Sequence, residues 1–353
     1  MNKGKIRMIV VMMVLCVTMI SGCGKDGSPT KVVFTTGTGK DEVFRINDEI
    51  CKKEEFMVYL TNIQNQYESV YGTEIWNAEY EGVTFEENVK DTVLARIAQV
   101  KTMYLMAKAK GIELTEAELT QLETAAGEYY ASLSDSEIEL LGISKDTVYE
   151  LYEEYAMAQK IYQWIIRDVN PEISDDEARI ITVQHILIKT YYVDGEGKKT
   201  PYSALEKKAA YEQALEVYNM VMEGEQSFEK LASVYSADET VTYSFGKGQM
   251  DTVFESAAFN LATNEISEVV ESELGYHIIK CINTFDREET DANKQKLLEE
   301  RKNTVFGQEY DAFVKTLTKQ LNETLLDQIH FIHEETVTTT GFFDVYHRYF
   351  PAQ

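Results

Sequence analysis

Two histidines stand in apolar stretches that lie far apart in the sequence. His185 falls within residues 180–188 and His277 within residues 275–282, and both stretches are rich in β-branched side chains. Such runs predict buried strands. On neighbouring strands, the two imidazoles could hydrogen-bond to each other and fix the polar groups around them. Taken singly, a histidine in such a strand is more often a satisfied core residue than part of a site.

No other set of residues predicts a different chemistry. Cys51 and Cys281 stand in apolar contexts without a partner for a nucleophilic thiol. A disulfide between them stays open, and two buried free thiols are the plainer interpretation. His330, His333 and Glu334 are metal-ligand types that lack further ligands, so we predict no metal. Phosphate-loop and dinucleotide motifs are absent from the sequence, and we predict no cofactor.

The composition limits the class of partner. The chain has 353 residues, enough for two domains, and carries 34 basic against 60 acidic side chains, a formal net charge of -26. Nucleic acids and anionic lipid surfaces are bound through an excess of Lys and Arg, so neither is expected as the main partner. The 22 tyrosines and 15 phenylalanines favour folded domains over disorder.

The first residues have the pattern of a signal peptide. A basic start is followed by an apolar stretch at residues 8–20, which is short for a membrane span. Ser21 and Gly22 then precede Cys23, which resembles the bacterial lipobox. We predict that residues 1–22 are removed, that Cys23 is lipidated, and that residues 23–40 are a tether. An ordinary cleaved signal or an uncleaved anchor is the alternative.

Residues 41–172 are predicted to be a helical domain. A short strand at 42–46 precedes apolar positions that recur at helical spacing through residues 50–168. Thr84 and Thr115 are each followed three residues later by Glu, which is the pattern of a capping box.

Residues 173–285 read as an α+β domain. Its predicted elements are the first histidine strand, a polar loop at 194–201, several helices, and strands at 266–271 and 276–285. A charged helix is predicted from Asp286 to Asn322. Its apolar stripe needs a partner, so we expect the segment 286–328 to pack back on the helical domain. Residues 329–353 form an aromatic tail without an assigned role.

Several ordered motifs in the α+β segment resemble the parvulin family of peptidyl-prolyl isomerases. They are His-Ile-Leu-Ile at 185–188, the stretch 228–236, Gly-Gln-Met at 248–250, the stretch 254–259, Asn-Glu-Ile-Ser at 264–267 and Gly-Tyr-His-Ile-Ile at 275–279. Behind a lipobox and between helical flanks, the segment is similar to that of PrsA-type foldase lipoproteins of Gram-positive bacteria. Relatives of the SurA type share this organisation. The resemblance implies an α+β fold in which a small antiparallel-sheet domain is inserted between the N- and C-terminal segments of one helical chaperone domain.

The resemblance also implies site residues. It assigns the proline pocket to Met250, Phe254, Phe259 and Gln249. It assigns the catalytic set to His185, Asp238, His277 and Ser272, with an electrostatic and orienting role. Met250 and Phe254 taken alone would read as core, and Asp238 as a turn residue. One departure from the family pattern is that residues 239–244 lead almost directly into Phe245 and Gly246, so the glycine-rich stretch that supplies a pocket rim is shortened.

These features together favour an extracytoplasmic, membrane-anchored foldase that isomerises X-Pro bonds in unfolded secreted polypeptides. The expected location is the outer face of a Gram-positive cell membrane, with the chain held by lipid on Cys23, and a homodimer is left open. The alternative is a non-catalytic holdase with a degenerate parvulin domain. A solute-binding lipoprotein is disfavoured because residues 50–168 show no repeated βαβ pattern.

Overall fold

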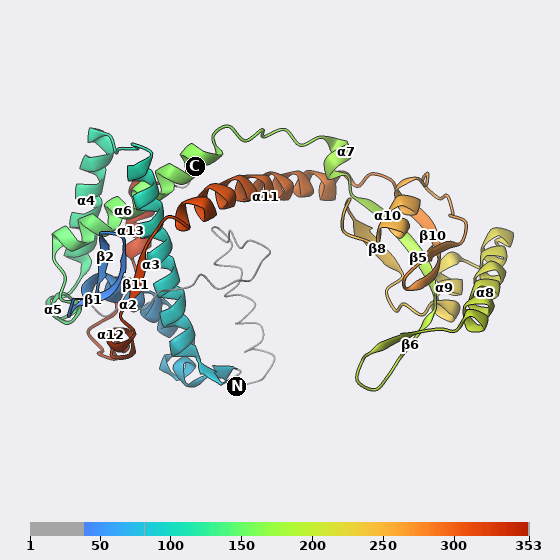
Figure 1. Ribbon diagram of the computed structural model, residues 1–353, viewed down its shortest axis with the longest axis horizontal. Helices are drawn as coiled ribbons and strands as arrows, with labels where there is room; N and C mark the ends of the chain where they lie inside the picture. The colour runs from blue at the N-terminus through green and yellow to red at the C-terminus, as the bar shows by residue number, and fades with distance from the viewer. Residues whose placement is uncertain (1–38, 81, 352–353) are drawn as a thin grey trace. The chain divides into compact units, whose positions relative to one another are not determined.

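The computed structural model describes residues 39–80 and 82–351, which form two compact units (Figure 1). The first unit consists of the described parts of Met1–Val169 and Asn303–Gln353, and the second is Asn170–Lys302. The predicted signal peptide, Cys23 and nearly all of the tether lie outside the described residues. Among the helices that are described, none has the length and apolar character needed to cross a bilayer.

The first unit is mainly helical. Its helices are α2 (Lys53–Tyr71), η1 (Thr73–Asn77), α3 (Phe85–Ala109), α4 (Glu116–Ser132), α5 (Asp135–Leu141), α6 (Lys145–Ile166), the C-terminal part of α11 (Arg287–Val314), α12 (Glu323–Asp327) and α13 (Phe342–Tyr349). Its strands are β1 (Glu42–Ile46), β2 (Glu49–Lys52), β3 (Glu79–Tyr80), β4 (Val83–Thr84) and β11 (Lys319–Leu321). The capping boxes predicted at Thr84 and Thr115 are confirmed, because each hydroxyl and the following Glu bond reciprocally.

The C-terminal segment completes this unit. Strand β11 pairs with β1, so that Phe44 lies opposite Leu321. Helix α13 lies beside α4 (Figure 1) and buries Phe342 among the rings of Tyr59 and Tyr152. The Tyr152 hydroxyl donates to the backbone oxygen of Phe342 at 2.6 Å. The tail that the sequence left without a role is therefore part of the core of the first unit.

Two predictions for this unit were wrong in detail. Residues 50–168 are not all helical, because β2, η1 and the β3–β4 pair interrupt them. The helix predicted to reach Asn322 ends at Val314, since the following residues turn and join the sheet as β11. Helical periodicity could not show the end of the helix at Val314, because pairing of β11 with β1, far away in the sequence, decides it.

The second unit is built on one antiparallel sheet. Its elements are α7 (Asp175–Ala178), β5 (Ile181–Lys189), β6 (Tyr191–Val193), β7 (Lys199–Pro201), α8 (Ala204–Glu223), α9 (Phe228–Tyr235), β8 (Thr242–Phe245), α10 (Thr252–Phe259), β9 (Val270–Ser272), β10 (Gly275–Asn283) and the N-terminal part of α11. The strand order is β8-β5-β10-β9, and all pairs are antiparallel. The predicted α+β class is confirmed.

Alternation along β5 and β10 separates the two faces of this sheet. Ile186, Ile188 and Ile278 pack under α8 and α9, whereas Val183 and Ile279 face α10. The polar loop predicted at 194–201 is in part the β6–β7 hairpin. The strand predicted at 266–271 is reduced to β9 and an isolated bridge at Ile266, so that prediction was also wrong in extent.

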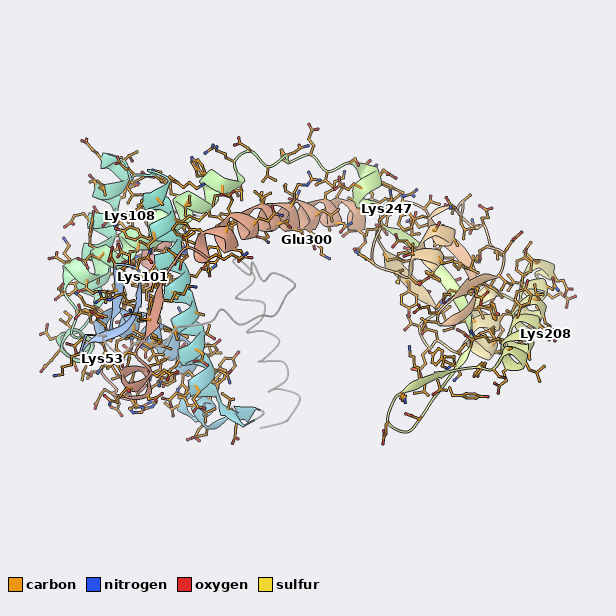
Figure 2. All side chains as sticks on the ribbon, in the orientation of Figure 1. Lys53, Lys101, Lys108, Lys208, Lys247 and Glu300 are labelled. Atoms are coloured by element: carbon orange, nitrogen blue, oxygen red, sulfur yellow. The ribbon has the colours of Figure 1, made fainter. Side chains whose placement is uncertain are left out.

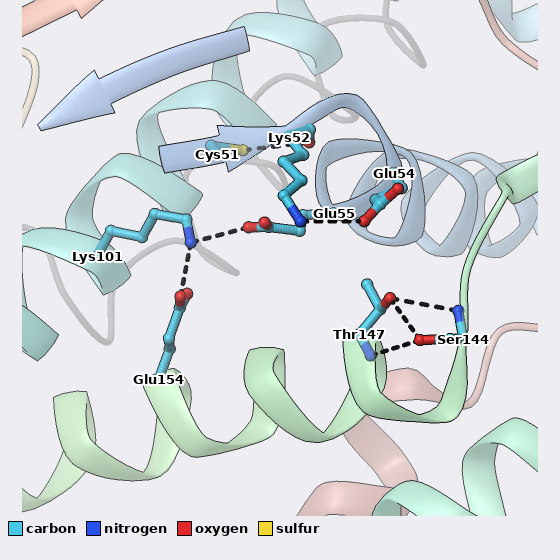
Figure 3. A network of polar contacts seen from close by, with 8 residues as sticks. All are labelled: Cys51, Lys52, Glu54, Glu55, Lys101, Ser144, Thr147 and Glu154. Carbon is cyan, nitrogen blue, oxygen red and sulfur yellow. Dashed lines mark hydrogen bonds and ion pairs between the residues drawn. The ribbon is translucent and has the colours of Figure 1, made fainter. Parts of the chain in front are cut away.

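A buried ionic cluster ties three helices of the first unit together. Lys101 on α3 is only 1% exposed, unlike Lys208 on the surface of α8 in the second unit (Figure 2). Its Nζ lies 2.8 Å from Glu55 Oε2 on α2 and 2.6 Å from Glu154 Oε1 on α6 (Figure 3). Burying charges is costly unless each is paired, so the position of each helix depends on the other two.

One carboxyl group of the cluster, that of Glu154, titrates near neutral pH. Burial raises the pKa of Glu154 to about 7, against the attraction of Lys101. Burial would lower the pKa of Lys101, but the two carboxylates outweigh it and hold that pKa above its ordinary value. The lysine therefore stays charged, and the carboxyl groups adjust to it.

Substitution of Lys101 is expected to lower the free energy of unfolding of the first unit more than substitution of a surface residue does. Lys101→Met leaves Glu55 and Glu154 facing each other without a cation, at an expected cost of about 3–5 kcal/mol in the free energy of unfolding. Both tryptophans of the chain, Trp76 and Trp164, lie in this unit, so tryptophan fluorescence during urea unfolding reports on it alone.

Two further variants make this measurement specific. Lys110→Met removes an exposed pair with Glu309 and should change stability by less than about 0.5 kcal/mol. Combining Lys101→Met with Glu55→Gln and Glu154→Gln should recover much of the loss, because no unpaired charge then remains. Equal stability of the Lys101 and Lys110 variants would contradict the role given to the cluster.

Candidate active site

The register of the central strands brings the two histidines together. Leu187 lies opposite His277 and His185 lies opposite Ile279, so the histidines are diagonal neighbours on one face of the β5–β10 pair. Residues in that relation are within reach of each other's side chains. The rings are nearly parallel, with centroids 5.5 Å apart, and both side chains are buried.

A chain of hydrogen bonds runs through both rings. His185 Nδ1 lies 3.3 Å from His277 Nδ1. On one side, His185 Nε2 lies 3.2 Å from Asp238 Oδ2, which also accepts from the Tyr243 hydroxyl at 2.9 Å. On the other side, His277 Nε2 lies 2.8 Å from Ser272 Oγ. The structure thus brings the four residues of the predicted catalytic set into one continuous network.

The proton positions in this network follow from its two ends. Asp238 is held as a carboxylate and only accepts, so His185 donates from Nε2 and accepts at Nδ1. His277 must then donate from Nδ1 and accept at Nε2. Ser272 donates its hydroxyl proton to that nitrogen and accepts from the Leu274 N–H at 3.1 Å. Every bond has one donor and one acceptor when both imidazoles are neutral.

The electrostatics agree with neutral rings. Burial and, to a smaller extent, the neighbouring His185 together lower the pKa of His277 to about 4. Burial also lowers the pKa of His185, although Asp238 opposes that shift. For Asp238 burial would raise the pKa, but bonds from the Thr240 N–H and the Tyr243 hydroxyl outweigh it and the pKa is lowered. At neutral pH the site therefore holds one carboxylate and two uncharged imidazoles.

An apolar wall lies against the histidines on the α10 side of the sheet. Phe254 is buried and meets both imidazoles, at 5.5 Å from the His185 ring and 5.1 Å from the His277 ring. Met250 and Phe259 are half-buried and pack on the same apolar cluster. The three apolar residues predicted for the proline pocket thus share one face of the domain with the network.

Gln249 has a different environment. Its side-chain Oε1 accepts from the Gly246 N–H at 3.1 Å, which braces the turn before α10. The residue itself is exposed. The geometry therefore gives Gln249 a bond within the turn, whereas Met250, Phe254 and Phe259 belong to the apolar cluster.

Tyr243 is the site residue that the sequence analysis missed. It lies in the short span 239–244, where a pocket rim was expected to be lacking. Its ring meets His185 edge-on at 5.3 Å, and its hydroxyl binds Asp238. Strand β8 pairs Tyr243 with Val183 and thereby brings the ring to the site. The signal was the alternation of Tyr243 and Phe245, which marks one face of a short strand.

Comparison with known families decides the identity of this unit. Residues 185–283 match the family described as Rotamase, the PPIC-type PPIASE domain. They form a parvulin-type peptidyl-prolyl isomerase domain. The resemblance seen in the motifs is confirmed: residues 185–283 are a peptidyl-prolyl isomerase domain of the parvulin type.

Relatives of the parvulin domain and its flanks are foldases. The Foldase protein PrsA of Caldanaerobacter subterraneus subsp. tengcongensis is 28% identical over 288 residues, which cover 78% of this chain and 85% of that protein. The Foldase protein PrsA of Staphylococcus aureus strain Newman is 31% identical over 167 residues, which cover 45% of this chain. That match spans 50% of the Staphylococcus protein.

Two solved structures resemble parts of the chain, with small structural overlap. A peptidylprolyl isomerase (PrsA) from Bacillus cereus is 18% identical, covers 76% of this chain and 97% of its own, and has a TM-score of 0.34. NmPin, the parvulin of Nitrosopumilus maritimus, is 31% identical, covers 30% of this chain and 97% of its own, and has a TM-score of 0.22. The assignment of the parvulin domain therefore depends on the sequence match.

The remaining chemical candidates do not gather into a second centre. Cys51 and Cys281 are both buried free thiols, and they belong to different units. No group of three or more metal-ligating side chains occurs in residues 39–80 and 82–351. His333 instead lies 3.5 Å from Glu68.

The lowered pKa values predict that the parvulin domain loses stability in acid. The unfolded chain takes up protons near pH 6.5, but folded His277 resists until about pH 4, so the unfolded state binds more protons between these values. The free energy of unfolding should fall by roughly 3 kcal/mol as the pH drops through that window. The intensity of the folded-state His185 ring signal during urea unfolding, recorded by NMR at several pH values, measures this change.

A matched pair of variants isolates the effect. His277→Asn keeps a donor near the Nδ1 position without a titrating group, so most of the pH dependence should disappear. His330 is exposed, and His330→Asn should leave the pH dependence unchanged. A His277 ring that titrates near pH 6.5 in the folded wild type would contradict the neutral network.

Proposed function

We propose that this chain is a membrane-anchored foldase that catalyses cis–trans isomerisation of X-Pro bonds in unfolded secreted polypeptides. One observation carries the proposal: an apolar wall of Met250, Phe254 and Phe259 stands against a closed network of neutral histidines, inside a parvulin domain. The wall would take the proline ring, and the network would hold the polar groups that face the reacting amide.

The chemistry needs binding and orientation only. Rotation about an X-Pro bond has a barrier of about 18–20 kcal/mol, and no covalent bond breaks. The catalyst must favour the twisted amide over the planar one. A twisted amide has lost conjugation and is less polar, so a poorly hydrated pocket disfavours it less than water does.

The polar residues are given orienting roles. Both imidazoles are neutral and fully bonded, so neither is free to act as a general acid. His185 and His277 fix the positions of Asp238 and Ser272 at the two ends of the network. Asp238 would provide a fixed negative charge near the substrate carbonyl, and Ser272 a hydroxyl. No nucleophile and no cofactor takes part in this scheme.

A cavity next to the polar end of the site would take the substrate residues that flank the proline. A cavity of about 400 Å³ is bordered by Leu187 and by Ala237, the residue before Asp238. The rings of Tyr192, Tyr202 and Tyr235 line it as well. Aromatic walls of this kind bind extended chains of varied sequence, which suits a foldase for unfolded clients.

A holdase without catalysis is the second candidate. The short span 239–244 supports it, because the glycine-rich rim of the family pattern is lacking there. Tyr243 occupies this span and contacts the network, which favours a working site over a degenerate one. Catalysis is therefore the stronger proposal.

Removing the pocket wall should slow proline-limited refolding. Met250→Ala and Phe254→Ala each remove apolar contact worth about 1–3 kcal/mol, so kcat/KM for an X-Pro substrate should fall about tenfold or more. Met220→Ala is the matched control, since Met220 is half-buried on the α8 face of the same sheet. The rate is read from the slow refolding phase of a protein limited by proline isomerisation.

The outcome separates the two candidates. A full-length chain that leaves the slow phase unchanged but still suppresses aggregation is a holdase, and the proposal of catalysis then fails. Equal losses in the Met250 and Met220 variants would show a general loss of structure, and would argue against a pocket at Met250.

The anchoring proposal depends on Cys23. Its position after Ser21 and Gly22 favours lipidation, and two acyl chains on one cysteine suffice for stable attachment to a membrane. The location proposed for the folded units is the outer face of the cell membrane of a Gram-positive organism. The names of the foldase relatives are consistent with such a role.

Cys23→Ala should release the protein from the membrane. We expect the variant to lose incorporation of labelled palmitate and to leave the membrane fraction, because no acylated residue remains. Cys16→Ala provides the control, since Cys16 lies in the predicted signal peptide and would be removed with it. Membrane attachment that is unchanged in both the Cys23→Ala and the Cys16→Ala variant would favour an uncleaved anchor.

A further inference from the structure

Glu255 occupies a small anion-binding turn at the start of α10. Its Oε2 accepts from three consecutive backbone amides, those of Gly248 at 2.8 Å, Gln249 at 3.2 Å and Met250 at 3.4 Å. Gly248 has a φ of +79°, in the left-handed region that glycine adopts without strain. A left-handed residue within a turn helps to direct successive N–H groups toward one point, where they bind a negative group.

This contact is separate from the capping of the helix. The cap of α10 is Asp251, whose Oδ1 accepts from the N–H groups of Val253 and Phe254. The nearest lysine in the sequence, Lys247, pairs with Asp176 at 2.7 Å. Glu255 is thus an additional, half-buried carboxylate that accepts from three amides of one turn.

The turn held by Glu255 carries one wall of the proline pocket. Met250 is its last residue, and its amide is among the three that Glu255 binds. Phe254, the other main wall, directly precedes Glu255 in α10. The carboxylate therefore joins the backbone of Met250 to the helical turn that holds Phe254, and Gln249 braces the same turn through Gly246.

We propose that Glu255 is a positioning residue of the isomerase: it fixes Met250 relative to Phe254 and so keeps the proline pocket open at the right width. This inference rests on the pocket proposed above. Glu255 does not touch the substrate, and it acts through the backbone of Met250. Loss of the carboxylate frees three N–H groups and allows the turn to move away from α10.

The proposal predicts an order of effects among substitutions. Glu255→Ala removes the acceptor entirely. Glu255→Gln keeps one carbonyl oxygen at the right distance, but it loses the charge that makes such bonds roughly twice as strong. Glu255→Asp keeps the charge on a side chain that is one methylene shorter. We expect the largest effect for Ala, a partial one for Gln, and no full rescue by Asp.

The test measures KM and kcat separately on the full chain with an X-Pro tetrapeptide, by exchange NMR. The pocket walls contact proline in the ground state and in the twisted state alike, so their displacement mainly weakens uniform binding. Glu255→Ala should raise KM about fivefold and leave kcat within about twofold. Glu265→Gln is the matched control, because its carboxylate also accepts a loop amide, that of Ala262, outside the pocket.

A spectroscopic readout tests the displacement directly. The methyl signals of ¹³C-labelled methionine are recorded, and that of Met250 is assigned from its absence in Met250→Leu. In Glu255→Ala the Met250 methyl signal should shift or broaden, and in Glu265→Gln it should stay in place. A merely structural role for Glu255 would lower thermal stability without moving KM or this signal.

The outcomes separate this inference from the pocket on which it rests. If Met250→Ala leaves KM unchanged, the pocket itself is wrong. If Met250→Ala raises KM while Glu255→Ala changes neither KM nor the Met250 signal, the pocket stands and the role of Glu255 is overturned. A raised KM together with a shifted Met250 signal supports both.

Discussion

The antiparallel register of β5 and β10 sets the diagonal contact between His185 and His277, and the site is built outward from that contact. A slip of one residue in either strand would turn one ring to the α8 face and separate the pair. The register is well specified because both faces are apolar and each is covered by helices. Burial that secures the register also keeps the imidazoles neutral, so packing and chemistry have one cause.

Around this contact, separate segments each hold one part of the site. Strand β8 supplies Tyr243, whose hydroxyl binds Asp238, and the end of strand β9 supplies Ser272. In the loop before α10, the Met250 N–H donates to Glu255, and the Gly246 N–H donates to the side chain of Gln249. Few of these contacts face a substrate directly. A prolyl isomerase has no bond to break, so its residues serve mainly to keep a pocket rigid and dry.

The first unit uses a different device to set its geometry. Three helices meet at Lys101, whose ammonium group lies between the carboxyl groups of Glu55 and Glu154. Such a cluster costs desolvation energy and gains it back only when all three groups are in place. The C-terminal segment adds β11 to the edge of β1 and inserts Phe342 among buried tyrosines. Described segments on both sides of the parvulin domain therefore contribute to one core.

Sequence alone determined the α+β class, the helix caps at Thr84 and Thr115, the family of the central domain, and the candidates His185, Asp238, His277 and Ser272 that the structure joins in one network. Those features depend on local periodicity, on short-range capping and on ordered motifs, all of which are visible along the chain. Only the tertiary structure decided the histidine tautomers, the contact of Tyr243, the place of the aromatic tail and the ending of α11 at Val314. Each of these results from pairing between segments far apart in sequence. Periodicity describes which face of an element is buried, but not which partner buries it.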